Sequence, residues 1–121
     1  MSKVRSLSFQ KTRRLIRSRE FDRVKQDGHP VRGKFIVLNV FAVQNSGFSR
    51  VGFITSRIVG SAVVRNRVRR RLREIVRKRQ RDLRDGFWIV LIARRCAGNA
   101  SYSALEGEWL RLAKRASILA S

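Results

Sequence analysis

The chain has little of several residue types that define common protein classes. Among its 121 residues there is one cysteine, Cys96, so an intramolecular disulfide and a cysteine-rich zinc site are both excluded. A reducing cytoplasm is therefore the expected location. The longest apolar runs, residues 35–43 and 87–93, fall far short of the ~20 residues that a membrane helix needs. No apolar segment follows the basic N-terminus, which argues against a secretory signal.

Residues that titrate near neutral pH or carry negative charge are equally scarce. Eight Asp and Glu stand against 29 Lys and Arg, with a single histidine, and the formal net charge is +21. Acid–base catalysis needs a positioned titratable pair, and a divalent metal needs a cluster of carboxylates. Neither is evident, so we expect no catalytic residue and no metal site from the protein alone. His29, beside Gly28 and Pro30, is expected to be a solvated loop residue.

A single proline and a few scattered glycines leave no candidate linker between domains. The length suits one domain that buries roughly two-thirds of its unfolded surface. Hydrophobic residues make up 43% of the chain, which is too much for a disordered basic tail. We therefore expect a basic N-terminal arm over residues 1–17 and a single folded domain over residues 18–121.

The positive charge is concentrated in two segments. Residues 1–19 carry +7 with no acid, and residues 61–85 carry +8. Of the 29 basic residues 23 are arginine, whose planar guanidinium suits phosphates and bases. A polyanion that relieves the self-repulsion is thus the expected partner. A membrane surface is the competing partner for a basic amphipathic helix, but the apolar stripe of this helix is needed for the domain's own core.

Hydrophobic periodicity and turn residues predict six elements in the order helix, strand, strand, helix, strand, helix. Three helices on a small mixed sheet would form a two-layer α+β sandwich. The two early strands are expected to pair as a hairpin around the turn signal at residues 45–47. The predicted elements are a helix with Ser18 as N-cap that ends at Gly28, strands over 34–44 and 50–56, a helix over 61–84, a strand over 87–93, and a last helix capped by Ser101 or Ser103 that runs to about residue 119.

The long helix has an apolar stripe opposite an arc of arginines. Arginines four residues apart repel each other by a few tenths of a kcal/mol per pair. Few acids lie nearby to offset this repulsion. The arginine face is therefore expected to bind an anionic ligand.

The most specific motif lies at the start of this helix. From Ala62 the chain reads Ala-Val-Val-Arg-Asn-Arg-Val-Arg-Arg. This order resembles the signature of the bacterial ribonuclease P protein component, in which an Ala and two residues precede Arg-Asn-Arg, an aliphatic residue and a basic pair. The resemblance covers roughly residues 9–119, with further matches at residues 13–15, 18–21, 50–53 and 89–94.

The resemblance implies a specific function. The family protein is a subunit of an RNA enzyme that removes the 5′ leader from precursor tRNA. Metal-assisted phosphodiester hydrolysis would belong to the catalytic RNA, which would also bind most of the Mg²⁺. The protein would act as a monomer, one per RNA. The family also implies a left-handed crossover around the signature helix, although such crossovers are usually right-handed.

The resemblance and the charge pattern assign three sets of residues. The candidates for contact with the catalytic RNA are Arg65, Asn66, Arg67, Arg69, Arg70, Arg73 and Arg77. The candidates for a leader-binding cleft between the first helix and the sheet are Phe21, Lys25, Val37, Leu38, Ser56 and Arg57. The candidates for RNA contacts from the arm are Arg13, Arg14 and Arg17.

Two positions depart from the family pattern. Lys25 stands where the family commonly has a second aromatic residue, and Leu38 aligns with a position that is often Tyr. The alternative function is that of a basic ribosomal protein with a structural role in binding rRNA, which would also explain the charge and the small α+β body.

Overall fold

The computed structural model describes residues 14–15, 17–44 and 47–120 of the chain. Within this part the chain forms three α-helices, four strands and three short 3-10 turns. The helices are α1 (Ser18–Asp27), α2 (Ala62–Lys78) and α3 (Tyr102–Arg115), the strands are β1 (His29–Arg32), β2 (Ile36–Ala42), β3 (Arg50–Ile54) and β4 (Phe87–Ala93), and the 3-10 turns are η3 (Arg57–Val59), η4 (Gln80–Asp82) and η5 (Arg95–Asn99).

The four strands form one mixed sheet in the order β1-β2-β4-β3. β4 is antiparallel to β2 and parallel to β3, so the predicted hairpin between the two early strands is wrong. β4 takes the central position because all seven of its residues are apolar and suit burial on both faces. β1 was not predicted. It places His29 and Pro30 in a strand at the sheet edge, where a proline that cannot donate a ladder hydrogen bond is tolerated.

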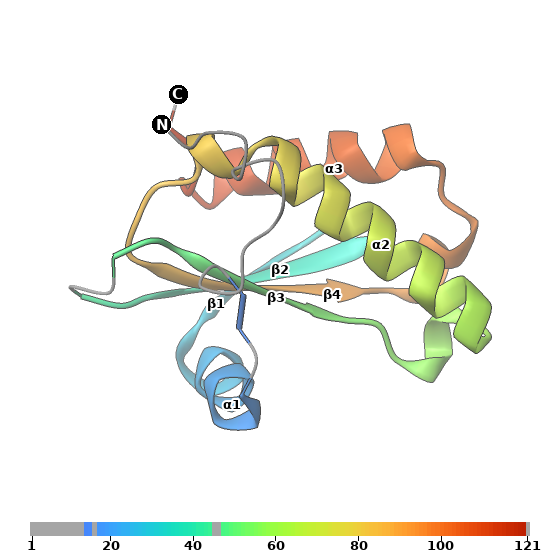
Figure 1. Cartoon of the computed structure of the whole chain (residues 1–121), viewed down its shortest axis with the longest axis horizontal. Coiled ribbons are helices and arrows are strands. Elements are labelled where there is room, and N and C mark those ends of the chain that lie inside the picture. Colours follow the sequence, from blue (N-terminus) through green and yellow to red (C-terminus); the bar gives the residue numbers. More distant parts are fainter. Residues whose placement is uncertain (1–13, 16, 45–46, 121) are drawn as a thin grey trace, which may run out of the picture.

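Helices cover both faces of the sheet (Figure 1). α2 and α3 lie on one face, and α1 lies on the other. The main core is on the first face, where Leu38 and Leu91 of the sheet, Leu72 of α2 and Trp109 of α3 belong to one buried cluster. The expected α+β class is confirmed, and α1 adds a small third layer around Leu15, Val24 and Val90.

The helix boundaries differ from the predicted ones for local reasons. α2 ends at Lys78 and not at residue 84, because Leu83 reaches the core from a β-bridge with Leu119. The N-cap of α1 is Arg17 and not Ser18, and the Arg17 amide donates to the Glu20 carboxylate at 3.2 Å. Ser101 caps α3 as predicted, since its hydroxyl accepts from the Ala104 amide at 3.1 Å. In the described ranges no helix is long and apolar enough to cross a membrane.

Candidate nucleic-acid interface

α2 carries the arginine signature on every side that does not face the core. Val68, Leu72, Ile75 and Val76 are fully buried against the sheet and α3. The remaining positions follow the predicted amphipathic pattern, in which an apolar stripe binds the core and the opposite arc is cationic. The arginines divide into two flanks and an outer face, and the three groups have different surroundings.

One flank of α2 is tied to the turn that precedes α3. The Arg67 guanidinium donates to the carbonyl oxygen of Gly98 at 3.0 Å, and Arg71 donates to that of Ala100 at the same distance. Both arginines are half-buried. Arg67, one of the predicted RNA contacts, therefore has a hydrogen-bonding role within the protein.

The other flank of α2 faces the exposed edge of β3. Arg69 donates to the hydroxyl of Thr55 and, at 3.2 Å, to the side-chain oxygen of Asn66. The Arg73 guanidinium lies 5.9 Å from the centre of the Phe53 ring, a cation–π contact. Arg65 donates to the carbonyl oxygen of Gly60 at 3.4 Å. The guanidinium groups of Arg65, Arg69 and Arg73 thus lie beside the sheet, and none of the contacts just described is with an acidic residue.

The N-terminal segment meets this flank at the same edge. Leu15 donates from its amide to the carbonyl oxygen of Val51 at 2.9 Å, which attaches the segment to β3. Burial, followed by the positive charges of Arg14 and Arg69, lowers the pKa of Arg73 below its ordinary value. The Nε atoms of Arg14 and Arg73 are buried without a hydrogen-bond partner. An anion bound beside these guanidinium groups would relieve the repulsion between them.

The outer face of α2 is open to solvent. Asn66 and Arg70 are exposed, while Arg77 is half-buried and forms an ion pair with Glu74. Of the predicted arm residues, Arg17 is exposed at the start of α1 and Arg13 lies outside the described residues. The surface that a polyanion could reach thus consists of Arg70, Arg14 and the flank of α2 that faces β3.

A cleft lies between α1 and the sheet, on the face opposite to α2. Its volume is about 330 Å³, and it brings together the predicted residues Phe21 and Lys25. The Phe21 ring lies so close to β3 that a Cβ atom at Gly52 would stand 2.5 Å from it. The lining residues are Phe21, Asp22, Val24, Lys25, Asn39, Ile54, Val90 and Ile92.

The other predicted cleft residues are spread over three places. Val37 pairs with Ile92 and so lies on the cleft face of the sheet. Leu38 does not line the cleft, because it is fully buried in the main core on the opposite face. Neighbouring residues of a strand point to opposite faces, so Val37 and Leu38 cannot share one surface. Ser56 and Arg57 are exposed in the connection that follows β3.

The cleft also contains residues that the sequence reasoning missed. Asn39 is 92% buried, and its side-chain oxygen has no hydrogen-bond partner. Ile54 is an exposed apolar residue at the end of β3. The sequence could have indicated Asn39, because side chains alternate between the two faces of a strand and Asn39 therefore shares a face with Val37. Apart from Asp22, the cleft is lined by apolar side chains, an asparagine and a lysine, a set that suits an unpaired nucleotide.

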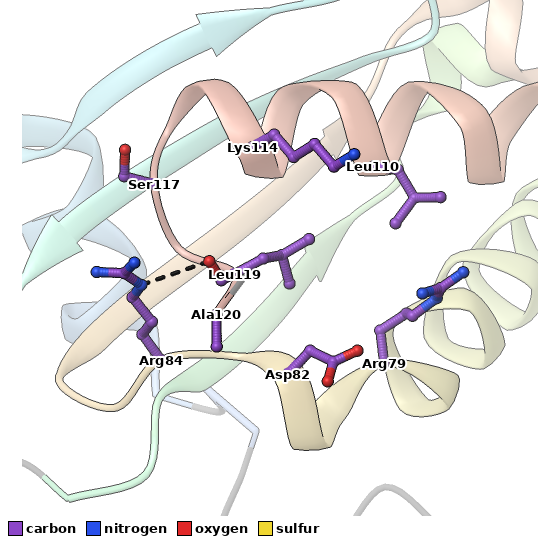
Figure 2. Close-up of a pocket in the computed structure, with 8 residues that line it drawn as sticks. All are labelled: Arg79, Asp82, Arg84, Leu110, Lys114, Ser117, Leu119 and Ala120. Carbon is purple, nitrogen blue, oxygen red and sulfur yellow. Dashed lines mark hydrogen bonds between the residues drawn. The ribbon is translucent and has the colours of Figure 1, made fainter.

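A second and larger cavity, of about 590 Å³, lies where α2 and α3 end (Figure 2). Arg79, Arg84 and Lys114 surround it, and Arg84 donates to the carbonyl oxygen of Leu119 at 3.4 Å. Asp82 also lines it. The carbonyl ends of both helices add partial negative charge there, which opposes anion binding. None of the signature residues lines this cavity, so we do not assign the RNA interface to it.

Comparison with known sequences decides the family. The family model described as Ribonuclease P matches residues 9–117, nearly the whole chain. The chain belongs to the ribonuclease P protein family. It is 36% identical over 111 residues to the ribonuclease P protein component of Syntrophomonas wolfei, covering 91% of this chain and 92% of the relative. Identity to the component from Symbiobacterium thermophilum is 39% over 99 residues, covering 82% and 86% of the two chains.

Solved structures of ribonuclease P proteins share the fold. The protein from Thermotoga maritima superposes with a TM-score of 0.76 at 27% identity, covering 84% of this chain and 96% of that one. A Staphylococcus aureus ribonuclease P protein gives a TM-score of 0.82 at 23% identity, covering 88% and 97%. The chain is accordingly a subunit of ribonuclease P, an endoribonuclease, and the ribosomal alternative receives no support from these matches.

Proposed function

We propose that this protein binds the RNA subunit of ribonuclease P and the 5′ leader of precursor tRNA, one protein per RNA, and so promotes endonucleolytic 5′ maturation of tRNA. The observation that carries the proposal is the position of β3. The free edge of β3 lies beside Arg14 and the arginines of α2. The face of the sheet under α1, to which β3 contributes Ile54, forms part of the cleft. β3 thus lies between a cationic surface that would bind a polyanion and a cleft that would bind unpaired nucleotides.

The catalytic RNA would contact the arginine side of this edge. Arg70 is exposed and free to approach phosphates, and Arg69, Arg73 and Arg14 would clamp one from the β3 side. Phosphate contacts of this kind position the protein and dominate its affinity. Arg67 is expected to act indirectly, because its hydrogen bond to Gly98 holds α2 in place.

The leader would enter the cleft on the other side. The Phe21 ring offers a stacking surface, and Lys25 at the rim would attract a phosphate of the leader. Asn39 lines the cleft, and its side-chain amide would hydrogen-bond to the edge of a base after a change of rotamer, which is how unpaired RNA is commonly recognised. Lys25 thereby replaces stacking by charge at the position where the family commonly has a second aromatic residue.

We infer that the chemistry belongs to the RNA. The described residues contain no group of three or more His, Cys, Asp or Glu side chains that could hold a metal ion. The described part of the chain thus offers no cluster that would hold Mg²⁺ by itself, and we expect RNA phosphates to supply most of its ligands. The protein's contribution is therefore to bind, to orient the leader and to neutralise phosphate charge.

Reconstitution tests the proposal. Purified protein is added to a bacterial ribonuclease P RNA at low Mg²⁺ with precursor tRNA, and release of the leader is measured. We expect faster cleavage with the protein than without it, and no cleavage by the protein in the absence of RNA. If the protein leaves the rate of the RNA unchanged and instead sediments with ribosomal subunits, the proposal fails.

A further inference from the structure

A second aromatic surface lies on the same sheet face as the leader cleft. Phe41 of β2 and Trp88 of β4 are register partners, and their ring centres are 6.2 Å apart at an interplanar angle of 59°. Both residues are half-buried, so part of each ring is open to solvent. They pack at the margin of the small cluster around Val24 and Val90.

An arginine lies over each ring, and each arginine forms an ion pair with a residue of α1. The Arg23 guanidinium lies 5.0 Å from the centre of the Phe41 ring, and its Nε is 2.6 Å from the Asp27 carboxylate. The Arg50 guanidinium lies 5.9 Å from the Trp88 ring. Arg50 is fixed by the Glu20 carboxylate at 2.8 Å and by the carbonyl oxygen of Arg14 at 3.0 Å. The result is a preformed row of guanidinium, ring, ring and guanidinium.

α1 separates this row from the leader cleft. Phe21 and Lys25 face the cleft, whereas Glu20 and Arg23, on the opposite flank of the helix, face the aromatic row. Along β4 the two surfaces are centred on Ile92 and Trp88, four residues or about 13 Å apart. A leader longer than the cleft can hold would meet the aromatic row if it continues along β4 in this direction.

We propose that the row formed by Arg23, Phe41, Trp88 and Arg50 stacks unpaired leader nucleotides that lie upstream of those in the cleft. The inference rests on the proposed function, because it assigns a second site to the same RNA. Bases stack on aromatic rings and on arginine planes, and neither contact depends on base identity. The arginines would also attract the phosphates, in agreement with the net charge of +21.

Tryptophan fluorescence tests the stacking directly. The chain has two tryptophans, and Trp109 is fully buried in the main core. Full-length protein is titrated with an unstructured oligouridylate of about 12 nucleotides, within the range of known single-strand sites. We expect quenching of the Trp88 contribution, and no quenching in the Trp88→Phe variant, which reports Trp109 alone. Unchanged emission of the unmodified protein on saturation with the oligonucleotide would overturn the proposal.

Leader length separates this site from the cleft. In reconstituted ribonuclease P, Trp88→Leu should weaken binding of a long-leader precursor about tenfold and leave a precursor whose leader fills only the cleft unchanged. Phe21→Leu should weaken both substrates. Equal loss for the two leaders in Trp88→Leu, or quenching of Trp88 by the catalytic RNA without substrate, would overturn the upstream site while leaving the proposed function intact. Failure of the protein to stimulate cleavage at all would instead refute the proposed function.

Discussion

Arg67 of the signature helix donates a hydrogen bond to the carbonyl oxygen of Gly98, 3.0 Å away in the turn that precedes α3. The second arginine of the Arg-Asn-Arg motif thus joins two elements that are far apart in the sequence. Arg71 repeats the contact one helical turn later, at Ala100. A motif that the resemblance assigns to RNA contacts therefore includes a residue that also supports the fold.

We expect Arg67→Ala to destabilise the free protein by about 1–2 kcal/mol, since a half-buried charged hydrogen bond is lost and the Gly98 carbonyl is left without this donor. Urea unfolding measures the change. Arg70→Ala is the matched control, because Arg70 is exposed on the same helix. It should change stability by less than about 0.5 kcal/mol and weaken binding to the catalytic RNA. Equal stability of the two variants would contradict the structural role of Arg67.

Gly52 determines where the Phe21 ring lies. A Cβ atom at this position would stand 2.5 Å from two ring carbons of Phe21, so Gly52→Ala must shift the ring away from β3. We expect about tenfold weaker binding of leader-bearing precursor tRNA by the reconstituted enzyme, with binding of mature tRNA unchanged. Titration of both RNAs measures the difference.

Gly107→Ala provides the control for this substitution. The added methyl group there meets only the end of the Arg111 side chain, at 3.7 Å, and the residue lies within α3. It should stabilise the protein by about 0.5–1 kcal/mol without any effect that depends on the leader. A Gly52→Ala variant that binds precursor as tightly as Gly107→Ala would show that the position of Phe21 is unimportant.

The sequence predicted much of this fold because its strongest patterns are local. The apolar stripe of α2, the Ser101 cap and the apolar run of β4 each depend on residues close together in the chain. Strand pairing does not, and the predicted hairpin failed because β4, distant in sequence, inserts between β2 and β3. β1 was missed since its four residues, His29–Arg32, include a proline and only one half-buried apolar side chain.

The same limit applies to the candidate site. Phe21 and Lys25 were found through a motif, but Asn39 and Ile54 reach the cleft only through the sheet register. Leu38 was misplaced because two adjacent strand residues were assigned to one face. The position of Arg14, close enough for its charge to act on Arg73, follows from pairing along the β3 edge, which no local pattern encodes.

Glu108 shows such a long-range contact within the core. Its carboxylate is almost fully buried and accepts hydrogen bonds from the amides of Lys34, Phe35 and Ile36, at 2.9, 2.7 and 2.7 Å. Glu108→Ala would leave these donors without the carboxylate. We expect a loss of about 3 kcal/mol or more in the free energy of unfolding, measured by urea denaturation.

Glu106→Gln is the comparison for Glu108. Glu106 lies two residues away on α3 and pairs with Lys78 at 3.2 Å. Because that ion pair is partly exposed, its loss should cost less than about 1 kcal/mol. If the Glu106 and Glu108 variants unfold at the same urea concentration, the Glu108 carboxylate does not hold the start of β2 against α3.

Arg73 should show opposite effects in the free protein and in the complex. Burial and the charges of Arg14 and Arg69 lower its pKa, which means that the folded protein disfavours its charged form. Arg73→Gln removes one of three crowded charges, so we expect the free protein to be as stable as before or more stable. Binding to the catalytic RNA should weaken, and the slope of log affinity against log salt should become shallower by roughly 0.7–0.9, the value for one phosphate contact. A variant that is less stable and has an unchanged salt slope would show that Arg73 serves the fold and not the RNA.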